Sequence, residues 1–534
     1  MGLLLGSDGL AWTTKLGWLL VSSAAGILTA LMAALVPYSW ASQRPKNFPP
    51  GPKPVPFLGN LKLIPPSKSF ALSVTLPPVD TAVRPYNRAQ IRTSKRRGVE
   101  SLERCSGVSQ GPYAFGLLLT LVLIWRLLEK RSAIYSSRPP NYIANELICK
   151  NQTHILFTPY GSSWKTLRKC AQGLFVPRGL ASVHPIQQAE ATQTAYDILR
   201  EPGRYYEHIQ RYTTAVILAS VYGQRGETFD SPNVQALYDV QNRFTALLEP
   251  GAAPPVDGIT FLQHVPEFMA PWKQRAKQVR RDQREIYFRL YNATKERMAR
   301  GIRVGCFMEK LIEDQAKNQL DDEHTTYLGG ILMEAGSDTT SSTLLSFLLA
   351  MLENPVALKR AQEDVDRVCD VKRSPTISDL DNLPYIEACM HEVHTELCGI
   401  PHMLTQEDSY KGYVFPAGTI FFANTWAIHH DENEYDDPTQ TSYGWGAGRR
   451  ICSGQKLAEF SLKINIAKMV WAFDIERDTA ASPPDMSVET GYEGGFLVCP
   501  KKFPLKITPR SESHAATIKS EFEGMEGFYE RFAA

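Results

Sequence analysis

A single cysteine lies in a glycine-rich segment near the C-terminal end of the chain, in the sequence SYGWGAGRRICSG (442–454). A helical pattern follows Cys452, so its sulfur is expected near a helix N-terminus. Free N–H groups there, with the adjacent Arg449 and Arg450, favour a thiolate. The glycines allow a tight turn and close approach to a flat ligand. One thiolate without a partner cysteine or histidine does not make a zinc site. It can be an axial ligand of haem iron, and the alternative is an inert buried cysteine.

A second segment whose residues could take part in a reaction is MEAGSDTTSST (333–343), which lies within a long helical pattern. Ala335 and Gly336 are small and leave room beside the backbone. The polar residues that follow compete with the backbone for hydrogen bonds, and we expect them to open the helix locally. Asp338 next to Thr339 is an acid–hydroxyl pair of the kind that transfers protons. The alternative is a helix with an ordinary polar face.

The cysteine segment resembles the haem-binding loop of the cytochrome P-450 family, F-x-x-G-x-R-x-C-x-G. The matching positions are Trp445, in place of the phenylalanine, Gly448, Arg450, Cys452 and Gly454. The resemblance implies that Cys452 is the thiolate ligand of the iron of haem b, and that Gly448 and Arg450 belong to the cofactor-binding loop.

Three other segments resemble motifs of the same family. YGSSWKTLRK (160–169) is similar to its W-x-x-x-R helix, and Trp164 and Arg168 share one helix face because they are four residues apart. MEAGSDTTSST is similar to its A-G-x-[DE]-T helix. IPHMLTQEDSYKGYVFPAGT (400–419) is similar to a strand region that contacts a propionate, where His402 stands; the alternative is an ordinary surface histidine. The resemblance implies two groups of residues: propionate contacts at Trp164, Arg168, His402 and Arg450, and proton delivery by Asp338 and Thr339.

The elements that must position these residues are mostly helices. The chain has 534 residues, of which 43% are hydrophobic and 21% charged, so most of it can bury a core. The net charge of +2 argues against nucleic acid as the main partner, and the nine scattered cysteines argue against a disulfide framework. The patterns predict helices over 160–173, 186–200, 207–222, 232–248, 268–300, 305–319, 324–353, 355–370, 384–394 and 454–471.

Strands are a minor component of the prediction. Short strand-like pieces follow Pro401, and the alternation in 494–510 predicts a hairpin. The apolar run 113–125 is too short for a comfortable membrane span and is expected to be a core helix. The expected fold is therefore mainly α with minor β, a cytochrome P-450-like helical fold around a haem.

The N-terminal region predicts a membrane anchor. No charged residue occurs from Leu16 to Gln43, a length that spans a bilayer as a helix, although a cleaved signal peptide is the alternative. Positive charge is greater on the C-terminal side, which predicts a single-pass anchor with the catalytic domain in the cytosol. The family resemblance implies that the membrane is that of the endoplasmic reticulum. The expected organisation is an anchor (1–44), a proline-rich hinge (45–64) and a haem-binding catalytic domain (65–534), with 65–125 atypical and irregular.

The chain also departs from the family pattern. The E-x-x-R helix has Glu392, but Thr395 stands where arginine is expected, and the meander before the cysteine loop is absent from DDPTQTSYGWG (436–446). Loss of one partner from a buried ion pair costs roughly 3–5 kcal/mol. This favours an alternative in which the chain is a non-catalytic or misfolding relative. A membrane-tethered helical scaffold is a further alternative, but it gives no reason for the two motifs to occur together.

The main hypothesis is a haem-thiolate monooxygenase that inserts one oxygen atom from O2 into a small apolar organic substrate. The resemblance implies that electrons come from NADPH through cytochrome P-450 reductase, and basic residues near Cys452 suit an acidic electron donor. Several stretches, among them SRPPNYIANELI, are similar to the fungal branch that contains O-methylsterigmatocystin oxidoreductase. That branch implies a fungal secondary metabolite as substrate.

Overall fold

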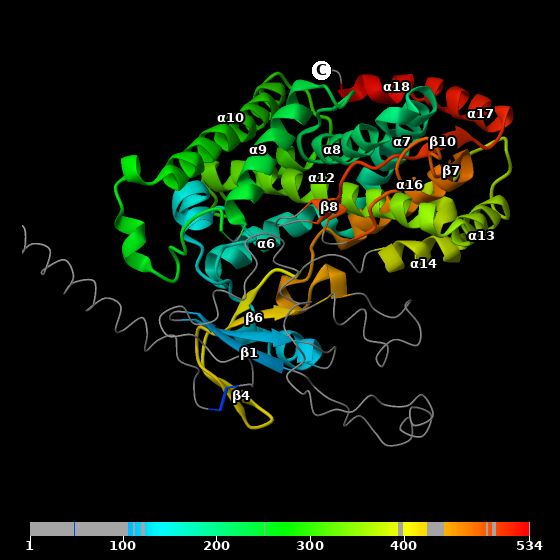
Figure 1. Cartoon of the computed structure of the whole chain (residues 1–534). Coiled ribbons are helices and arrows are strands. Elements are labelled where there is room, and N and C mark those ends of the chain that lie inside the picture. Colours follow the sequence, from blue (N-terminus) through cyan, green and yellow to red (C-terminus); the bar gives the residue numbers. More distant parts are fainter. Residues whose placement is uncertain are drawn as a thin grey trace, which may run out of the picture.

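The computed structural model describes residues 47–48, 105–110, 113–118, 123–249, 251–393, 399–423, 425, 443–487, 490–493 and 498–532. This part of the chain is mostly helical with a few short strands, which confirms the prediction of a mainly α protein with minor β. In Figure 1 the helices gather in one large part, and the sheet that contains β1 and β6 lies along its lower side. The predicted anchor (1–44), and the hinge (45–64) apart from two residues, lie outside the described residues.

The α-helices of the described chain mostly match the predicted ranges, but one begins at residue 177 rather than 186, one ends at 313 rather than 319, and those at 132–135, 512–523 and 526–529 were not predicted. They are α5 (Ser132–Tyr135), α6 (Ser162–Phe175), α7 (Pro177–Arg200), α8 (Tyr205–Tyr222), α9 (Pro232–Leu248), α10 (Pro271–Ala299), α11 (Phe307–Glu313), α12 (Asp322–Glu353), α13 (Pro355–Asp366), α14 (Pro384–Val393), α16 (Gln455–Ala472), α17 (Glu512–Glu523) and α18 (Glu526–Tyr529). Proline occupies the first position of α7, α9, α10, α13 and α14, where its missing N–H and fixed φ cost nothing.

Among the described residues, ten short strands form four small sheets. They are β1 (Cys105–Gln110), β2 (Tyr113–Leu118), β3 (His402–Met403), β4 (Asp408–Tyr410), β5 (Tyr413–Phe415), β6 (Ile420–Ala423), β7 (Phe473–Glu476), β8 (Tyr492–Glu493), β9 (Cys499–Pro500) and β10 (Lys506–Pro509) among the described residues. The largest sheet has the order β1-β2-β6-β3, in which β2 and β6 are parallel and the other pairs antiparallel. Through the pairing of β2 with β6, this sheet joins β1 and β2 to the strands that precede the cysteine loop in the sequence.

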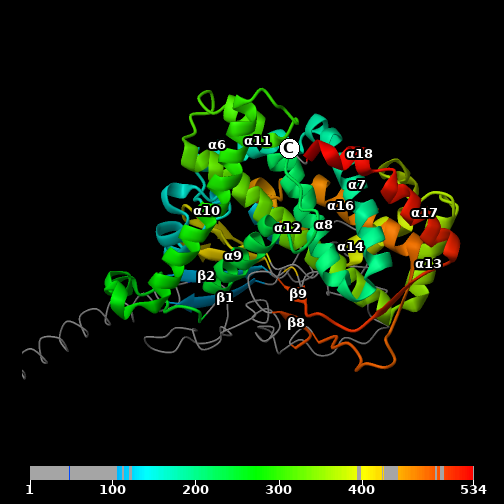
Figure 2. The ribbon, with the colours of Figure 1, turned by 90° about the horizontal axis from the view of Figure 1, so that it is seen from above.

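Helix α12 is the centre of the helical part. It packs against α8, α10 and α16, and Figure 2 shows it among α8, α9 and α10. Because neighbours surround it, its sequence is apolar on most sides, and Tyr327, Leu344 and Phe347 are fully buried. Asp321 caps its start by accepting a hydrogen bond from the His324 N–H at 2.7 Å. Its length and rigidity allow it to hold the Ala335–Thr339 segment in the interior.

Two predictions about which segments form helices and hairpins are wrong. The apolar run 113–125 is not a core helix: its first six residues form strand β2, whose parallel pairing with β6 satisfies the backbone, and a π-helical turn, η2 (Ile124–Glu129), follows. The end of the chain is not one hairpin over 494–510. Strand β10 pairs instead with β7, and β9 with β8. Short apolar runs do not distinguish strand from helix, and pairing across a long sequence separation leaves no local pattern.

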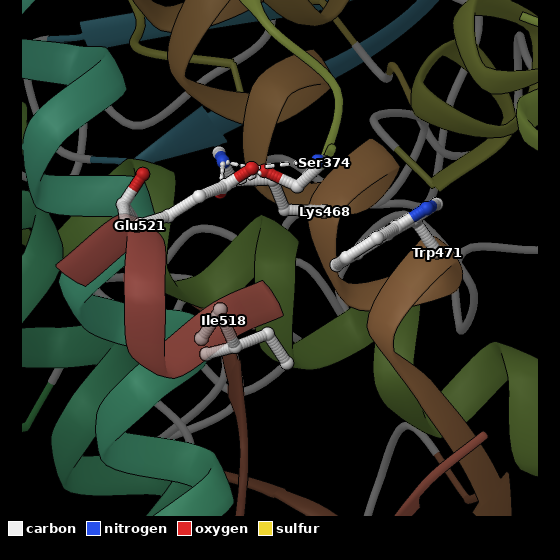
Figure 3. Close-up of a pocket in the computed structure, with 7 residues that line it drawn as sticks. Ser374, Lys468, Trp471, Ile518 and Glu521 are labelled. Atoms are coloured by element: carbon white, nitrogen blue, oxygen red, sulfur yellow. Dashed lines mark hydrogen bonds and ion pairs between the residues drawn. The ribbon is translucent and has the colours of Figure 1, made fainter. Parts of the chain in front are cut away.

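The two C-terminal helices, α17 and α18, are not predicted by the sequence patterns. Helix α17 is held on α16 by a buried polar contact (Figure 3). The Ser374 hydroxyl donates to Glu521 Oε2 at 2.5 Å, the Lys468 ammonium donates to the Ser374 hydroxyl, and Lys468 Nζ lies 3.5 Å from Glu521 Oε2. Trp471 and Ile518 pack beside this contact and are nearly fully buried. The helix is thus an integral part of the domain.

Within the described residues, no single helix combines the length and hydropathy of a membrane span.

Candidate functional site

The cysteine segment forms a compact loop between two helical elements. A single turn, η11 (Gly448–Arg450), precedes Cys452, and α16 begins three residues after it. The Cys452 N–H donates to the Trp445 carbonyl at 2.8 Å, which closes the loop. Gly448 has a φ of +59°, and a Cβ there would lie 2.1 Å from the Leu128 carbonyl oxygen. Glycine is therefore required at 448 by backbone conformation and by contact with η2.

The electrostatics of Cys452 differ in part from the sequence prediction. The residue is exposed, but protein atoms surround the sulfur closely enough that desolvation raises the pKa of the thiol. The N–H groups of Gly454 and Gln455 at the start of α16 oppose this shift, as predicted, and so does the charge of Arg168. The side chains of Arg449 and Arg450, to which the sequence analysis assigned this role, donate instead to the Tyr160 hydroxyl and to backbone carbonyls. A metal cation that binds the sulfur displaces its proton outright.

Helix α6 brings two predicted residues to this loop. Trp164 and Arg168 lie on the same face of α6, as their spacing predicts. The Arg168 guanidinium donates to the Ile451 carbonyl at 2.7 Å, next to the cysteine. The guanidinium carbon of Arg450 lies 4.4 Å from the centre of the Trp164 ring, so Trp164 also packs against the loop.

Backbone carbonyls hold the remaining cationic groups. Arg450 is buried and donates to the carbonyls of Ser136, Ile155 and Thr158 at 2.7, 3.1 and 2.7 Å. His402 begins β3 and is buried, and its Nδ1 lies 2.8 Å from the Tyr135 carbonyl oxygen. The alternative of an ordinary surface histidine is therefore wrong.

A further buried arginine, Arg138, joins this group and was not predicted. It is buried and donates to the carbonyls of Ile400 and Pro401 at 3.0 and 2.6 Å, beside His402. Neither its segment, SSRPP, nor the distance of that segment from the other motifs identifies Arg138 as a site residue in a single sequence.

Burial lowers the pKa of all four groups, and the charges of neighbouring arginines add to this effect at Arg450 and His402. Burial lowers the pKa of Arg450, and the charges of Arg138 and Arg168 lower it further. Burial, with the charges of Arg138 and Arg450, lowers the pKa of His402 to about 3. Within the described chain, none of the three arginines forms an ion pair with a carboxylate. A bound anion would relieve this accumulation of positive charge.

The predicted proton-delivery residues lie on α12. Asp338 and Thr339 are partly exposed, and Ala335 is exposed, although residues before and after this stretch are buried. One face of the central helix is therefore open at Ala335–Thr339. The predicted local opening of the helix itself is wrong, because α12 is a continuous α-helix there. The Thr339 hydroxyl donates to the Ala335 carbonyl at 2.8 Å, a side-chain bond to residue i−4 that leaves the helix intact.

The pKa of Asp338 is raised to about 7, first by burial and then by the nearby charge of Glu334. A carboxyl group with this pKa exchanges its proton readily near neutral pH.

Comparison with known proteins decides the family. The cytochrome P450 family model matches residues 100–507. The cytochrome P450 monooxygenase yanC of Aspergillus niger is 32% identical, and the alignment covers 94% of this chain and 96% of that protein. The chain belongs to the cytochrome P450 family.

Other members of the cytochrome P450 family are similarly close. The cytochrome P450 monooxygenase AOL_s00215g282 of Arthrobotrys oligospora is 33% identical over 90% of this chain and 92% of that protein, and patH of Aspergillus clavatus is 31% identical over 93% and 97%. A zebra fish cytochrome P450 structure with progesterone has the same fold, with a TM-score of 0.65 and 23% identity over 78% of this chain and 98% of that chain. Because these relatives are named monooxygenases, the chain is an oxidoreductase.

The residues of this cytochrome P450 fit a haem. The family implies haem with a cysteine thiolate, and Cys452 is the cysteine of the matching loop. A haem carries two propionate carboxylates, and the cluster of Arg138, Arg168, His402 and Arg450 lacks carboxylate partners among the described residues. The positive charge of the arginines and the negative charge of the propionates are therefore complementary.

One departure from the family pattern has a smaller consequence than the sequence suggests. Glu392, in the last turn of α14, is exposed. Water can solvate its carboxylate, so the desolvation penalty of a buried charge does not arise at this position. Thr395 and most of the shortened segment before Tyr443 lie outside the described residues. The alternative of a non-catalytic relative thus loses its main energetic argument.

Proposed function

We propose that this cytochrome P450 is a haem-thiolate monooxygenase that inserts one oxygen atom of O2 into an apolar organic substrate, while the second oxygen atom leaves as water. The observation that carries the proposal is the position of Cys452, exposed and flanked by Arg168, in a loop surrounded by cationic groups without carboxylate partners in the described chain. When bound, haem supplies the iron that binds and activates dioxygen with two electrons from a reductase.

Different residues around Cys452 would bind different parts of the cofactor. Cys452 would bind the iron, and its position is fixed by its own bond to Trp445 and by Gly448 against η2. Trp164, Arg168, His402 and Arg450 would hold the two propionates, with Arg138 beside them. Hydrogen bonds to backbone carbonyls fix the guanidinium groups before the ligand arrives, which reduces the ordering cost of binding.

Asp338 and Thr339 are proposed to deliver protons on the open face of α12. Asp338 is partly exposed, so it can recover a proton from solvent, and near pH 7 both of its protonation states are populated. The Thr339 hydroxyl, now bonded to the Ala335 carbonyl, is a donor and acceptor that can rotate toward a reacting oxygen atom. The small, exposed Ala335 keeps this face uncrowded, whereas a Cβ at Gly336 would meet Ile217 of α8.

The remaining parts of the proposal concern partners, location and substrate. NADPH is proposed to supply the electrons through cytochrome P450 reductase, with the exposed Arg449 and Lys456 near Cys452 as contacts for an acidic partner. The apolar N-terminal segment is proposed to anchor the chain in the endoplasmic reticulum membrane with the catalytic domain in the cytosol. The fungal origin of the three relatives supports a fungal secondary metabolite as the substrate class.

Reconstitution tests this function. The purified full chain is combined with a fungal cytochrome P450 reductase, NADPH and a panel of aromatic polyketides under ¹⁸O2. The expected result is a product that carries one ¹⁸O atom and forms only with reductase and NADPH. Substrate-independent NADPH consumption with no labelled product across a broad panel would count against a monooxygenase.

A further inference from the structure

A buried carboxylate, Glu334, lies one helical turn before Asp338 on α12. It is 5% exposed, although glutamate in a helix core is rarely buried without partners. Its Oε1 accepts hydrogen bonds from Gln283 Nε2 at 2.9 Å and from the Tyr287 hydroxyl, both on α10. Residues four apart have Cβ atoms about 5–6 Å apart, so Glu334 is an immediate neighbour of Asp338. Nothing in the proposed chemistry so far uses this residue.

The other oxygen of Glu334 faces a buried histidine. His154 Nε2 lies 3.6 Å from Glu334 Oε2, beyond hydrogen-bonding distance, and makes no hydrogen bond to the described chain. His154 Nδ1 accepts from the Leu156 N–H at 3.3 Å, which assigns the ring proton to Nε2 and directs it toward Glu334. The rings of Phe157 and Phe244, centred 4.8 and 5.9 Å away, pack on the imidazole. The carboxylate is therefore enclosed from both sides by donors.

The other titratable groups near the two carboxyls keep a constant charge near neutral pH. Burial raises the pKa of each of them, so each stays neutral. They are Tyr222 on α8, Tyr238 on α9, Tyr287 on α10, Cys149 after the turn η3 (Ile143–Ile148), and Cys499 on β9. The charge of these described neighbours therefore stays constant over the pH range in which Asp338 changes its protonation state.

We propose that Glu334, held by hydrogen bonds from Gln283 and Tyr287 and faced by His154, is a positioning residue whose negative charge favours the protonated form of Asp338. Its donors make Glu334 the better place for the negative charge, so repulsion across one helical turn leaves Asp338 as the member that holds the proton. Asp338 is also the partly exposed member, so its proton can be replaced from solvent. The inference rests on the proposed function for its purpose, since a proton on Asp338 is useful only if Asp338 delivers it.

Infrared titration of the purified ferric holoprotein tests the inference without substrate or reductase. The band of the protonated Asp338 carboxyl is assigned by its loss in Asp338→Asn, and its midpoint is measured in the wild type and in Glu334→Gln. The expected result is a midpoint lower by about one pH unit in Glu334→Gln, the order of magnitude for removal of one charge at this separation. The matched control is Glu323→Gln, the same change on the same helix about 16 Å away along its axis, which should leave the midpoint unchanged.

An unchanged midpoint in Glu334→Gln, or an equal shift in Glu323→Gln, overturns the inference. If Glu334→Gln does not fold, Tyr287→Phe replaces it: loss of one donor weakens the anionic form of Glu334, and the midpoint should fall by a smaller amount. No shift in that variant also overturns the inference. In turnover, the alkaline limb of the kcat profile should move with the infrared midpoint while KM stays constant. A shifted midpoint in a protein without monooxygenase activity would count against the proposed function alone.

Discussion

Arg450 stands two residues before Cys452, the proposed iron ligand, and its guanidinium carbon lies 4.4 Å from the centre of the Trp164 ring. The same guanidinium donates to three backbone carbonyls, so it joins the cysteine loop, helix α6 and the segment that precedes α6. This contact places the loop relative to the other cationic residues of the site. It therefore couples the stability of the domain to the capacity to hold a haem.

Arg450→Lys should weaken both properties. Lysine keeps the charge but cannot reproduce a planar fork that bonds three carbonyls and stacks on an indole. Each buried carbonyl left without its donor costs roughly 1–3 kcal/mol, so we expect a stability loss of at least about 2 kcal/mol and a lower haem content. Urea unfolding and the haem-to-protein ratio measure these effects. Arg449→Lys, at an exposed position, should change both by little; equal effects in the two variants would contradict the role of Arg450.

Gly448→Ala should destabilise the cysteine loop. The new Cβ would lie 2.1 Å from the Leu128 carbonyl oxygen, and the backbone has a positive φ. We expect a loss of at least about 2 kcal/mol, with contributions from strain and from displacement of the loop. Gly412→Ala is the control, because Gly412 has a φ of +82° but no atom within 4 Å of the added Cβ. Its loss should be near 1 kcal/mol, the cost of the backbone alone. Similar losses at both positions would exclude the contact with Leu128 as the cause.

Asp338→Asn should stabilise the protein at alkaline pH. The pKa of Asp338 is raised from 3.8 to about 7, so the folded state binds more protons than the unfolded state between these values, and stability falls as pH rises through this range. Asparagine removes that loss. The variant should exceed the wild type by up to about 4 kcal/mol at pH 8 and match it near pH 3.5, although activity falls. A constant difference at all pH values would contradict the raised pKa.

How far the sequence predicts the site depends on the range of each interaction. The motif around Cys452 and the spacing of Trp164 and Arg168 specify local geometry, and the structure brings these residues together as expected. The paths of the Arg450 hydrogen bonds were not predictable, because their acceptors are backbone carbonyls about 300 residues earlier in the chain. Arg138 was missed for the same reason.

Burial was the other property that single-sequence patterns could not give. His402 reads as an ordinary residue at a strand start, yet β3 pairs with β6 in the sheet and the side chain is 5% exposed. Glu392 reads as half of a buried ion pair, yet it is exposed. In each case the exposure of the side chain depends on which other elements pack over it, and that packing is set by the whole fold.

Glu521→Gln should destabilise the domain through the C-terminal helix. Lys468 is 2% exposed, and Glu521 is the carboxylate that offsets the burial of its charge. We expect a loss of about 2 kcal/mol, below the value for a fully buried pair because Glu521 is partly exposed. The double variant Lys468→Met/Glu521→Gln should recover most of the loss. Glu476→Gln, which removes an exposed partner of Lys506, should cost less than about 0.5 kcal/mol. Failure of the double variant to recover stability would show that the charge of Lys468 is not the cause.

The central claim is that the sulfur of Cys452 binds haem iron, and the spectrum of the reduced, carbon-monoxide-bound protein tests it most directly. The full chain, expressed with sufficient haem, should show the red-shifted Soret band of thiolate-ligated haem. Cys452→Ser should lose that band, and Cys499→Ser, a change at a cysteine on β9, should keep it. A wild-type protein that folds without porphyrin, or a Cys452→Ser variant with the band intact, would contradict the account.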